Sequence, residues 1–300
     1  MESLLKAVEL GRRYGQVKAL DGLNLDLKAG EIYGLVGKNG AGKTTFLKLV
    51  SGMVRPSSGY MEIFGETKNL YALRRRIGTM IETPEFFPSF TAWENLQYFR
   101  IHRGIGDASR IEALLESVGL GDVGRKKFKA FSLGMKQRLG LALALMGQPD
   151  ILLLDEPING IDPVGIVQIR EILRTLARER HLGIVISSHI LPEVEQLATV
   201  YGILDKGRLV WELRADALAA MERHHIRLRV DKTERALVIL EEKLGMKDYR
   251  VEADGSLTIF AAAEKVPEMT ACLVGQGLRV MEIKAESKSL EDFYVEYSES

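Results

Sequence analysis

One segment near the N-terminus constrains this chain more than any other feature. Residues 37–44 read GKNGAGKT and match the pattern G-x-x-x-x-G-K-[ST] at every position. In such a turn, glycines let backbone N–H groups wrap phosphate oxygens, the lysine adds positive charge, and the final hydroxyl can ligate Mg²⁺. An apolar run precedes the segment and a helical pattern follows it, so the helix points the positive end of its dipole at the same anion. An ordinary glycine-rich turn would not require this context. We therefore predict a phosphate site formed by Gly37, Asn39, Gly40, Ala41, Gly42, Lys43, Thr44 and Thr45.

A second element places two carboxylates at the end of an apolar run. Residues 151–156 read ILLLDE. Open α/β sheets bind ligands at the carboxyl ends of their strands, so this pair is placed where a nucleotide would lie. Asp155 would hold Mg²⁺, and Glu156 would polarise the attacking water as a general base. The alternative is the N-terminus of a helix, but the phosphate motif earlier in the chain favours the catalytic interpretation.

The order of apolar patterns predicts an α/β fold with a second, smaller domain. Runs at 32–36, 151–154 and 184–186 predict buried strands, and a helix at 163–179 between the last two predicts a mostly parallel sheet covered on both faces. Further strands are expected at 3–10, 17–28 and 60–64, and mostly helical structure at 91–145. Beyond these, segments 225–230, 233–245, 248–252, 256–260, 263–276 and 278–284 follow the β-α-β-β-α-β order of a ferredoxin-like domain. We expect domains at 1–213, with a helical subdomain at about 85–150, and at 214–300.

Composition excludes several classes of protein. Lys plus Arg and Asp plus Glu both number 41, so the formal net charge is zero, whereas nucleic-acid-binding domains are usually strongly basic. The single cysteine, Cys272, allows neither an intrachain disulfide nor a cysteine-based zinc site. The N-terminus lacks a signal-peptide pattern, and no run reaches the ~20 apolar residues of a membrane-spanning helix. Any membrane role is therefore expected to depend on a partner.

Together the motifs resemble the nucleotide-binding subunit of an ABC transporter, from about Leu4 to Trp211. Residues 131–138, FSLGMKQR, lie where the family has its L-S-G-G-Q signature followed by Q-R. Residues 159–162, NGID, resemble the D-loop, and residues 187–189, SSH, resemble the segment with the switch histidine. The resemblance implies a P-loop NTPase fold with an antiparallel β subdomain and a helical subdomain.

The resemblance also implies roles for individual residues. ATP and Mg²⁺ would be the cofactors, with Tyr14 stacking on adenine, Glu82 at the position of the family's glutamine, and His189 donating to the γ-phosphate and water. Thr44, Asp155 and Glu82 would be the magnesium ligands, and Asp162 the D-loop aspartate. The signature residues Ser132, Gly134 and Met135 would act on ATP bound to a second, head-to-tail copy. A separate transmembrane permease would be the partner, and this chain would be cytoplasmic and peripheral on the cytoplasmic face of the cell membrane.

Two departures from the family pattern indicate a subgroup. The family's glutamine is Glu82 here, and the signature has Leu133 and Met135 at its variable positions. With the stretch ETPEFFP at 82–88, these departures resemble the ATPases of bacitracin-resistance and lantibiotic-immunity exporters. Within that stretch, residues 86–88 are a candidate for the groove that holds a permease helix; a local hydrophobic cluster is the alternative.

Structural explanations compete with several of these roles. Tyr14 could be a packing aromatic, His189 a strand-end histidine, Glu82 a solvated loop charge, and Ser132 a helix N-cap.

Two other functions are alternatives to an ATPase subunit of a transporter. A soluble non-transport ABC-type ATPase of translation or DNA repair is disfavoured by the one P-loop and the neutral charge. A regulatory module without turnover is disfavoured because Lys43 and Glu156 are both present.

Overall fold

The computed structural model describes residues 2–81, 85–221 and 225–286. The chain folds as two compact units, residues 1–215 and 216–300. The sequence pattern predicts this boundary two residues earlier, after Leu213. Among the described residues, no helix is both long enough and apolar enough to span a membrane.

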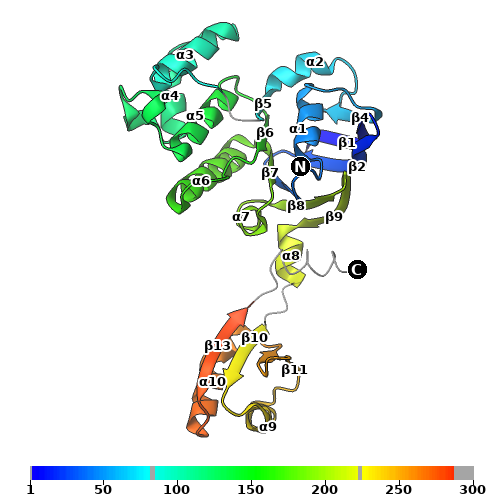
Figure 1. Cartoon of the computed structure of the whole chain (residues 1–300), viewed down its shortest axis with the longest axis vertical. Coiled ribbons are helices and arrows are strands. Elements are labelled where there is room, and N and C mark those ends of the chain that lie inside the picture. The colour runs from blue at the N-terminus through cyan, green and yellow to red at the C-terminus, as the bar shows by residue number, and fades with distance from the viewer. Residues whose placement is uncertain (1, 82–84, 222–224, 287–300) are drawn as a thin grey trace. The chain divides into compact units, whose positions relative to one another are not determined.

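A six-stranded sheet forms the centre of the first unit (Figure 1). Its strand order is β5-β6-β7-β3-β8-β9, with the first five strands parallel and β9 antiparallel to β8. Every residue of β3 and β7 is buried, which explains why these strands read as continuous apolar runs. The predicted parallel sheet is therefore confirmed. Its strands are β3 (Ile32–Val36), β5 (Ile77–Met80), β6 (Ile151–Asp155), β7 (Gly183–Ser188), β8 (Val200–Asp205) and β9 (Arg208–Arg214).

An antiparallel sheet of order β2-β1-β4 packs on this core through helix α1 (Lys43–Ser51). Its strands are β1 (Ser3–Tyr14), β2 (Val17–Lys28) and β4 (Ser58–Ile63). The expectation that the first strand ends at residue 10 is wrong: β1 continues to Tyr14, which pairs with Val17. Register shifts in this pairing interrupt the alternation of apolar residues, so the sequence pattern ends before the strand does.

Helices gather on one side of the sheet in the middle of the chain (Figure 1). As expected, residues 91–145 are largely helical, with turns between the helices. Thr91 and Glu94 form a reciprocal capping box that fixes the start of the first of them. Besides α1, the α-helices described in this unit are α2 (Leu70–Leu73), α3 (Ala92–His102), α4 (Arg110–Ser117), α5 (Leu133–Leu145), α6 (Pro163–Arg180) and α7 (Leu191–Glu195).

The second unit has its own core and the predicted β-α-β-β-α-β order. Helix α8 (Ala215–Met221) begins at the boundary between the two units. The elements that follow are β10 (His225–Val230), α9 (Thr233–Leu244), β11 (Tyr249–Val251), β12 (Leu257–Ile259), α10 (Val266–Gly275) and β13 (Val280–Glu286). The sheet has the order β11-β12-β10-β13, with antiparallel neighbours throughout. Ile226, Leu228 and Leu257 belong to the core of this unit and are fully buried.

Candidate nucleotide-binding site

The phosphate loop lies between β3 and α1, and two of its glycines allow close backbone contacts. A Cβ atom on Gly37 would lie 2.3 Å from the carbonyl oxygen of Leu204, and one on Gly42 would lie 2.4 Å from that of Ala19. Gly42 also has φ of 113°, in the left-handed region. Gly40, with φ of 84°, has no neighbouring atom within 4 Å of its Cβ position. The loop is thus packed at its two ends and open at Gly40, as a phosphate cradle requires.

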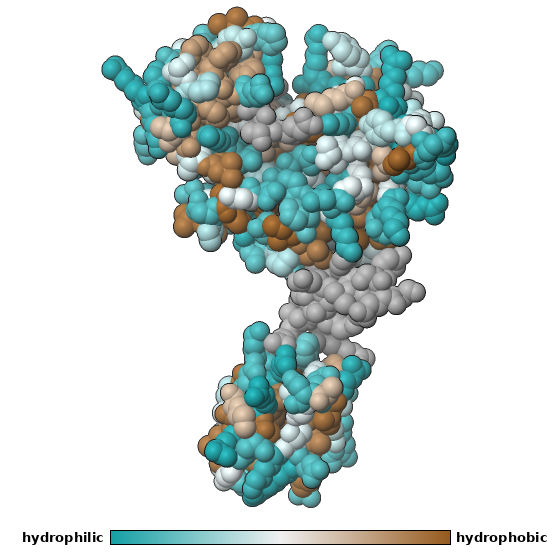
Figure 2. Space-filling model, viewed as in Figure 1, coloured by the Kyte–Doolittle hydropathy of each residue, from teal (hydrophilic) through white to brown (hydrophobic). Residues whose placement is uncertain are grey.

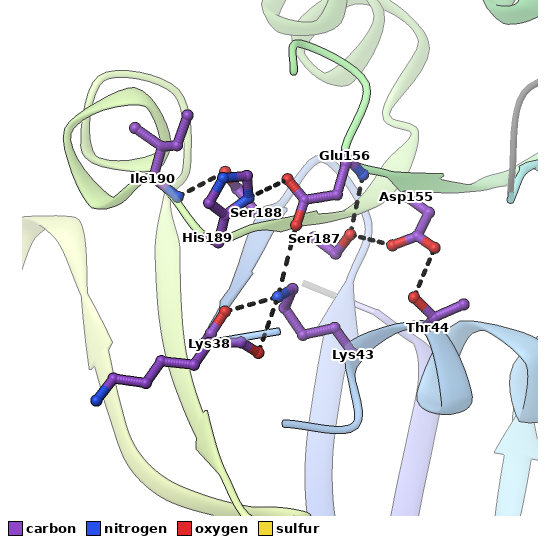
Figure 3. A network of polar contacts seen from close by, with 10 residues as sticks. Lys38, Lys43, Thr44, Asp155, Glu156, Ser187, Ser188, His189 and Ile190 are labelled. Atoms are coloured by element: carbon purple, nitrogen blue, oxygen red, sulfur yellow. Dashed lines mark hydrogen bonds and ion pairs between the residues drawn. The ribbon is translucent and has the colours of Figure 1, made fainter. Parts of the chain in front are cut away.

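Lys43 directs its ammonium group into this loop (Figure 3). Its Nζ donates to the carbonyl oxygens of Gly37 at 2.6 Å and of Lys38 at 3.3 Å. The same atom lies 3.5 Å from Oε1 of Glu156, and the side chain is only 6% exposed. A buried positive charge in a loop of backbone N–H groups is suited to bind an anion.

Thr44 and Asp155 bring two oxygen ligands together. The Thr44 hydroxyl donates to Oδ2 of Asp155 at 2.7 Å, joining the start of α1 to the end of β6. Hydroxyl and carboxylate oxygens are ligands that Mg²⁺ prefers, usually in combination with substrate phosphates. Within the described ranges, no three His, Cys, Asp or Glu side chains form a metal-binding group. The Thr44 hydroxyl and the Asp155 carboxylate fit an ion that takes its other ligands from the phosphates of a nucleotide.

Glu156 and His189 face each other from the ends of adjacent strands. Nδ1 of His189 lies 2.8 Å from Oε2 of Glu156. The Glu156 side chain is 24% exposed and that of His189 is 35% exposed, so water can reach both. Glu156 has φ of 47°, an uncommon value for a residue with a side chain. Such backbone strain is frequent at functional sites, where surrounding contacts maintain it.

The structure adds two residues to this site, Ser187 and Glu193. Ser187 bonds both Asp155 and the backbone of Glu156. In the sequence, the clue to Ser187 is a hydroxyl residue at the end of an apolar run, two positions before His189. Glu193, in α7, has a pKa raised by burial, and the charge of Glu156 raises it further while His189 and Arg170 oppose the shift. No sequence pattern marked Glu193.

The signature residues lie against the D-loop. Ser132 caps α5 by accepting a hydrogen bond from the Met135 backbone at 3.3 Å, and Asp162 caps α6 in the same way. Gly134 is buried, and a Cβ atom there would lie 3.2 Å from Cγ2 of Ile161. Signature and D-loop are therefore in contact. The polar contacts of Lys43 are made with other residues, Gly37, Lys38 and Glu156.

The remaining predicted residues have different positions. Tyr14 lies at the end of β1, 43% exposed, with the Arg12 guanidinium 4.5 Å from its ring centroid. The hairpin that carries it also contains Ala19, which lies against Gly42. Thr45 is partly buried in α1, Ala41 is buried and Asn39 is exposed. Glu82 lies outside the described residues, so its role as a magnesium or coupling residue stays a prediction.

The candidate permease groove is divided between core and surface. Phe86 is 7% exposed and packs on Phe99 and Phe128, with ring centroids 5.6 and 5.1 Å away. Phe87 is exposed and lies 4.7 Å from Tyr98, which is also exposed. On the face seen in Figure 2, apolar side chains gather over the region of α3 and α4. Phe86 thus belongs to a hydrophobic cluster, and Phe87 remains available for contact.

A phosphate loop facing an acidic pair and a histidine at the ends of parallel strands defines a P-loop ATPase of the ABC type. Comparison with known proteins supports the same class. Residues 20–159 match the family described as ABC transporter. The bacitracin transport ATP-binding protein BcrA of Bacillus licheniformis is 40% identical over 297 residues, which cover 98% of this chain and 97% of that protein. The chain belongs to the ABC transporter ATP-binding family.

Other relatives extend the comparison. The lantibiotic transport ATP-binding protein SrtF of Streptococcus pyogenes is 40% identical over 219 residues, covering 73% of this chain and 94% of that protein. A solved ATP binding subunit of an ABC transporter matches with a TM-score of 0.63 and 28% identity, covering 72% of this chain and 92% of that one. The dimeric post-hydrolysis structure of the cassette MJ0796, bound to ADP and Pi, matches with a TM-score of 0.63 and 25% identity, covering 70% and 98%.

Proposed function

We propose that this chain hydrolyses ATP to power a separate membrane permease that exports a peptide antibiotic or a similar amphiphile. The contact of Glu156 with both Lys43 and His189 carries the hydrolytic part of the proposal. Export and substrate class are supported by the similarity to bacitracin and lantibiotic transport ATP-binding proteins. A non-transport role in translation or DNA repair has no comparable support, since these relatives are transport proteins.

Each residue of the network has a distinct task in hydrolysis. Lys43 binds the outer phosphates, and Glu156 accepts the proton of the attacking water. His189, held by Glu156, orients that water and donates to the γ-phosphate. Thr44 and Asp155 would hold Mg²⁺, which neutralises charge on the phosphates when it is bound. Tyr14 would stack on adenine, and Glu82 would join the magnesium ligands.

A second copy of the chain completes the site in this proposal. Ser132, Gly134 and Met135 of one copy would close over the γ-phosphate held by the other, giving a head-to-tail homodimer with two ATP molecules. The exposed N-terminus of α5 at Ser132 suits an anion because its dipole is positive there. The similarity to the dimeric MJ0796 cassette supports this arrangement.

The permease would bind the aromatic surface formed by Phe87, Pro88 and Tyr98. These side chains are exposed, and a short amphipathic helix could pack on their rings. The chain would then be peripheral on the cytoplasmic face of the membrane. Opening and closing of the ATPase dimer would move the permease between its two states.

Co-expression of this chain with a candidate permease of about six membrane-spanning helices tests the proposal. Cells that express both proteins should survive higher concentrations of one or more compounds in a panel of peptide antibiotics. Cells with the permease and the Glu156→Gln variant should not. Active ATPase in membranes that shows no response to the permease, and no protection against any compound, would exclude the exporter.

The second unit should be separable from nucleotide binding, because the motifs all lie before Ala215. We propose a regulatory or dimer-supporting role for it. A protein ending at Ala215 should bind ATP within a few-fold of the full chain's affinity, measured by calorimetry. Folded protein that binds no nucleotide would contradict this.

A matched truncation two residues shorter serves as a stability control. Ending at Leu213 removes Arg214, whose Nη1 lies 2.8 Å from Oε1 of Glu31, a carboxylate only 4% exposed. Leaving this buried group without its cation should cost about 1–3 kcal/mol. The shorter protein should therefore melt at a lower temperature than the protein ending at Ala215.

A further inference from the structure

Ser187 is a fully buried hydroxyl that joins the two acidic residues of the site (Figure 3). Its Oγ donates to Oδ1 of Asp155 at 2.5 Å and accepts from the backbone N–H of Glu156 at 3.0 Å. The register of β6 and β7 sets Asp155 directly opposite Ser187. One side chain thus contacts both Asp155, the last residue of β6, and Glu156, which follows it.

The bond to Asp155 fixes the orientation of that carboxylate toward Thr44. With Oδ1 held by Ser187, Oδ2 faces the Thr44 hydroxyl at 2.7 Å. Without the Ser187 hydroxyl, the carboxylate could rotate about its terminal torsion, which is broad in aspartate. Ser187 therefore fixes the pair of oxygens that fits a metal ion.

The bond to Glu156 acts on strained backbone. Glu156 has φ of 47°, and its N–H is directed at Ser187, whose carbonyl oxygen lies 3.2 Å away and whose Oγ lies 3.0 Å away. These contacts hold the conformation from which the Glu156 side chain reaches Lys43 and His189. Ser187 thereby positions the general base through its main chain.

We infer that Ser187 is a positioning residue that orients Asp155 toward the metal and Glu156 toward the attacking water. The inference rests on the proposed function of this site as a magnesium–ATP site. Hydrogen-bond partners of metal ligands typically change metal affinity or activity by 10–100-fold when they are removed. Loss of the Ser187 hydroxyl should have an effect of this size.

The test compares Ser187→Ala with the wild-type full chain in magnesium titrations. Binding of a slowly hydrolysed ATP analogue is followed by fluorescence, so the measurement does not depend on turnover. Ser187→Ala should raise the magnesium concentration for half-maximal binding about tenfold or more. At saturating magnesium, kcat for ATP should still fall, because the Glu156 N–H keeps the Ser187 carbonyl oxygen but loses the closer of its two acceptors, Oγ.

Ser188 provides the matched control on the next residue. It is also buried, and its Oγ accepts from the backbone N–H of Ile190 at 3.0 Å instead of contacting a carboxylate. Ser188→Ala should leave the half-maximal magnesium concentration unchanged, whatever it does to the rate. Ser187→Thr keeps the hydroxyl and should restore magnesium dependence toward the wild-type value. Ser187→Cys, similar in size but a weak donor, serves if the alanine variant does not fold.

A double-mutant cycle shows whether Ser187 acts through Asp155. Asp155→Asn and Ser187→Ala should have effects on magnesium dependence that are far from additive when combined. Equal magnesium curves for wild type and folded Ser187→Ala or Ser187→Cys would overturn the inference. If the wild-type chain itself binds no magnesium–ATP, the proposed function fails instead.

Discussion

Glu156→Gln should bind ATP normally and lose turnover by about 10²-fold or more. Glutamine keeps the shape of the side chain but cannot accept a proton from water. It also removes the negative charge 3.5 Å from Lys43 Nζ and the carboxylate partner of His189. Phosphate release by purified protein measures turnover, and calorimetry measures ATP binding.

Glu171→Gln is the control for this substitution. Glu171 makes the same type of ionic contact with Arg174, but it is 61% exposed on the surface of α6. The same chemical change there should leave turnover within a few-fold of wild type. Near-normal hydrolysis by Glu156→Gln would remove Glu156 as general base and require another residue to activate the water.

Lys43→Ala should weaken nucleotide binding itself, by at least about tenfold, because it removes a charge-assisted contact with the phosphates. Lys43 also fills the loop and bonds the carbonyl oxygens of Gly37 and Lys38, so its loss should loosen the cradle. Calorimetric titration with ATP gives the affinity without any need for turnover.

Lys265→Met is a suitable comparison for Lys43→Ala. Lys265 lies in the second unit, half exposed, and pairs with Glu268. Its replacement should not change ATP affinity. Unchanged affinity in Lys43→Ala would mean that the phosphates are held by backbone N–H groups alone, and that Lys43 serves the structure of the loop.

Site residues that are close together in the sequence can be predicted more readily than those brought together by the fold. Residues 37–44 form a site almost entirely from local backbone geometry, and the apolar run before Asp155 predicts its place at a strand end. Ser187 could not be assigned in this way. Its contact with Asp155 depends on the register of β6 against β7, two strands separated by α6 in the chain.

Other differences arise where tertiary packing overrides local pattern. Phe86 and Phe87 are consecutive and chemically identical, yet one is buried among aromatic rings and the other is exposed. Only the position of α3 and of Phe128 decides which ring turns inward. The stacking role of Tyr14 and the in-trans role of Ser132 stay predictions for a different reason, since they concern partners that the chain does not contain.

The packing of Gly134 against Ile161 has a consequence for cooperativity. Ile161 also lies against Gly165 at the start of α6, so signature helix, D-loop and α6 meet at one side chain. Glu156 leads directly into this D-loop, with the Asn159 N–H bonded to its carbonyl oxygen. In the proposed homodimer, α5 would contact the ATP of the partner copy. The same helix packs on the D-loop that follows Glu156, the general base for the chain's own ATP. Hydrolysis at one site would then depend on ATP at the other site. The ATPase rate should therefore show a sigmoidal dependence on ATP concentration instead of a hyperbolic one.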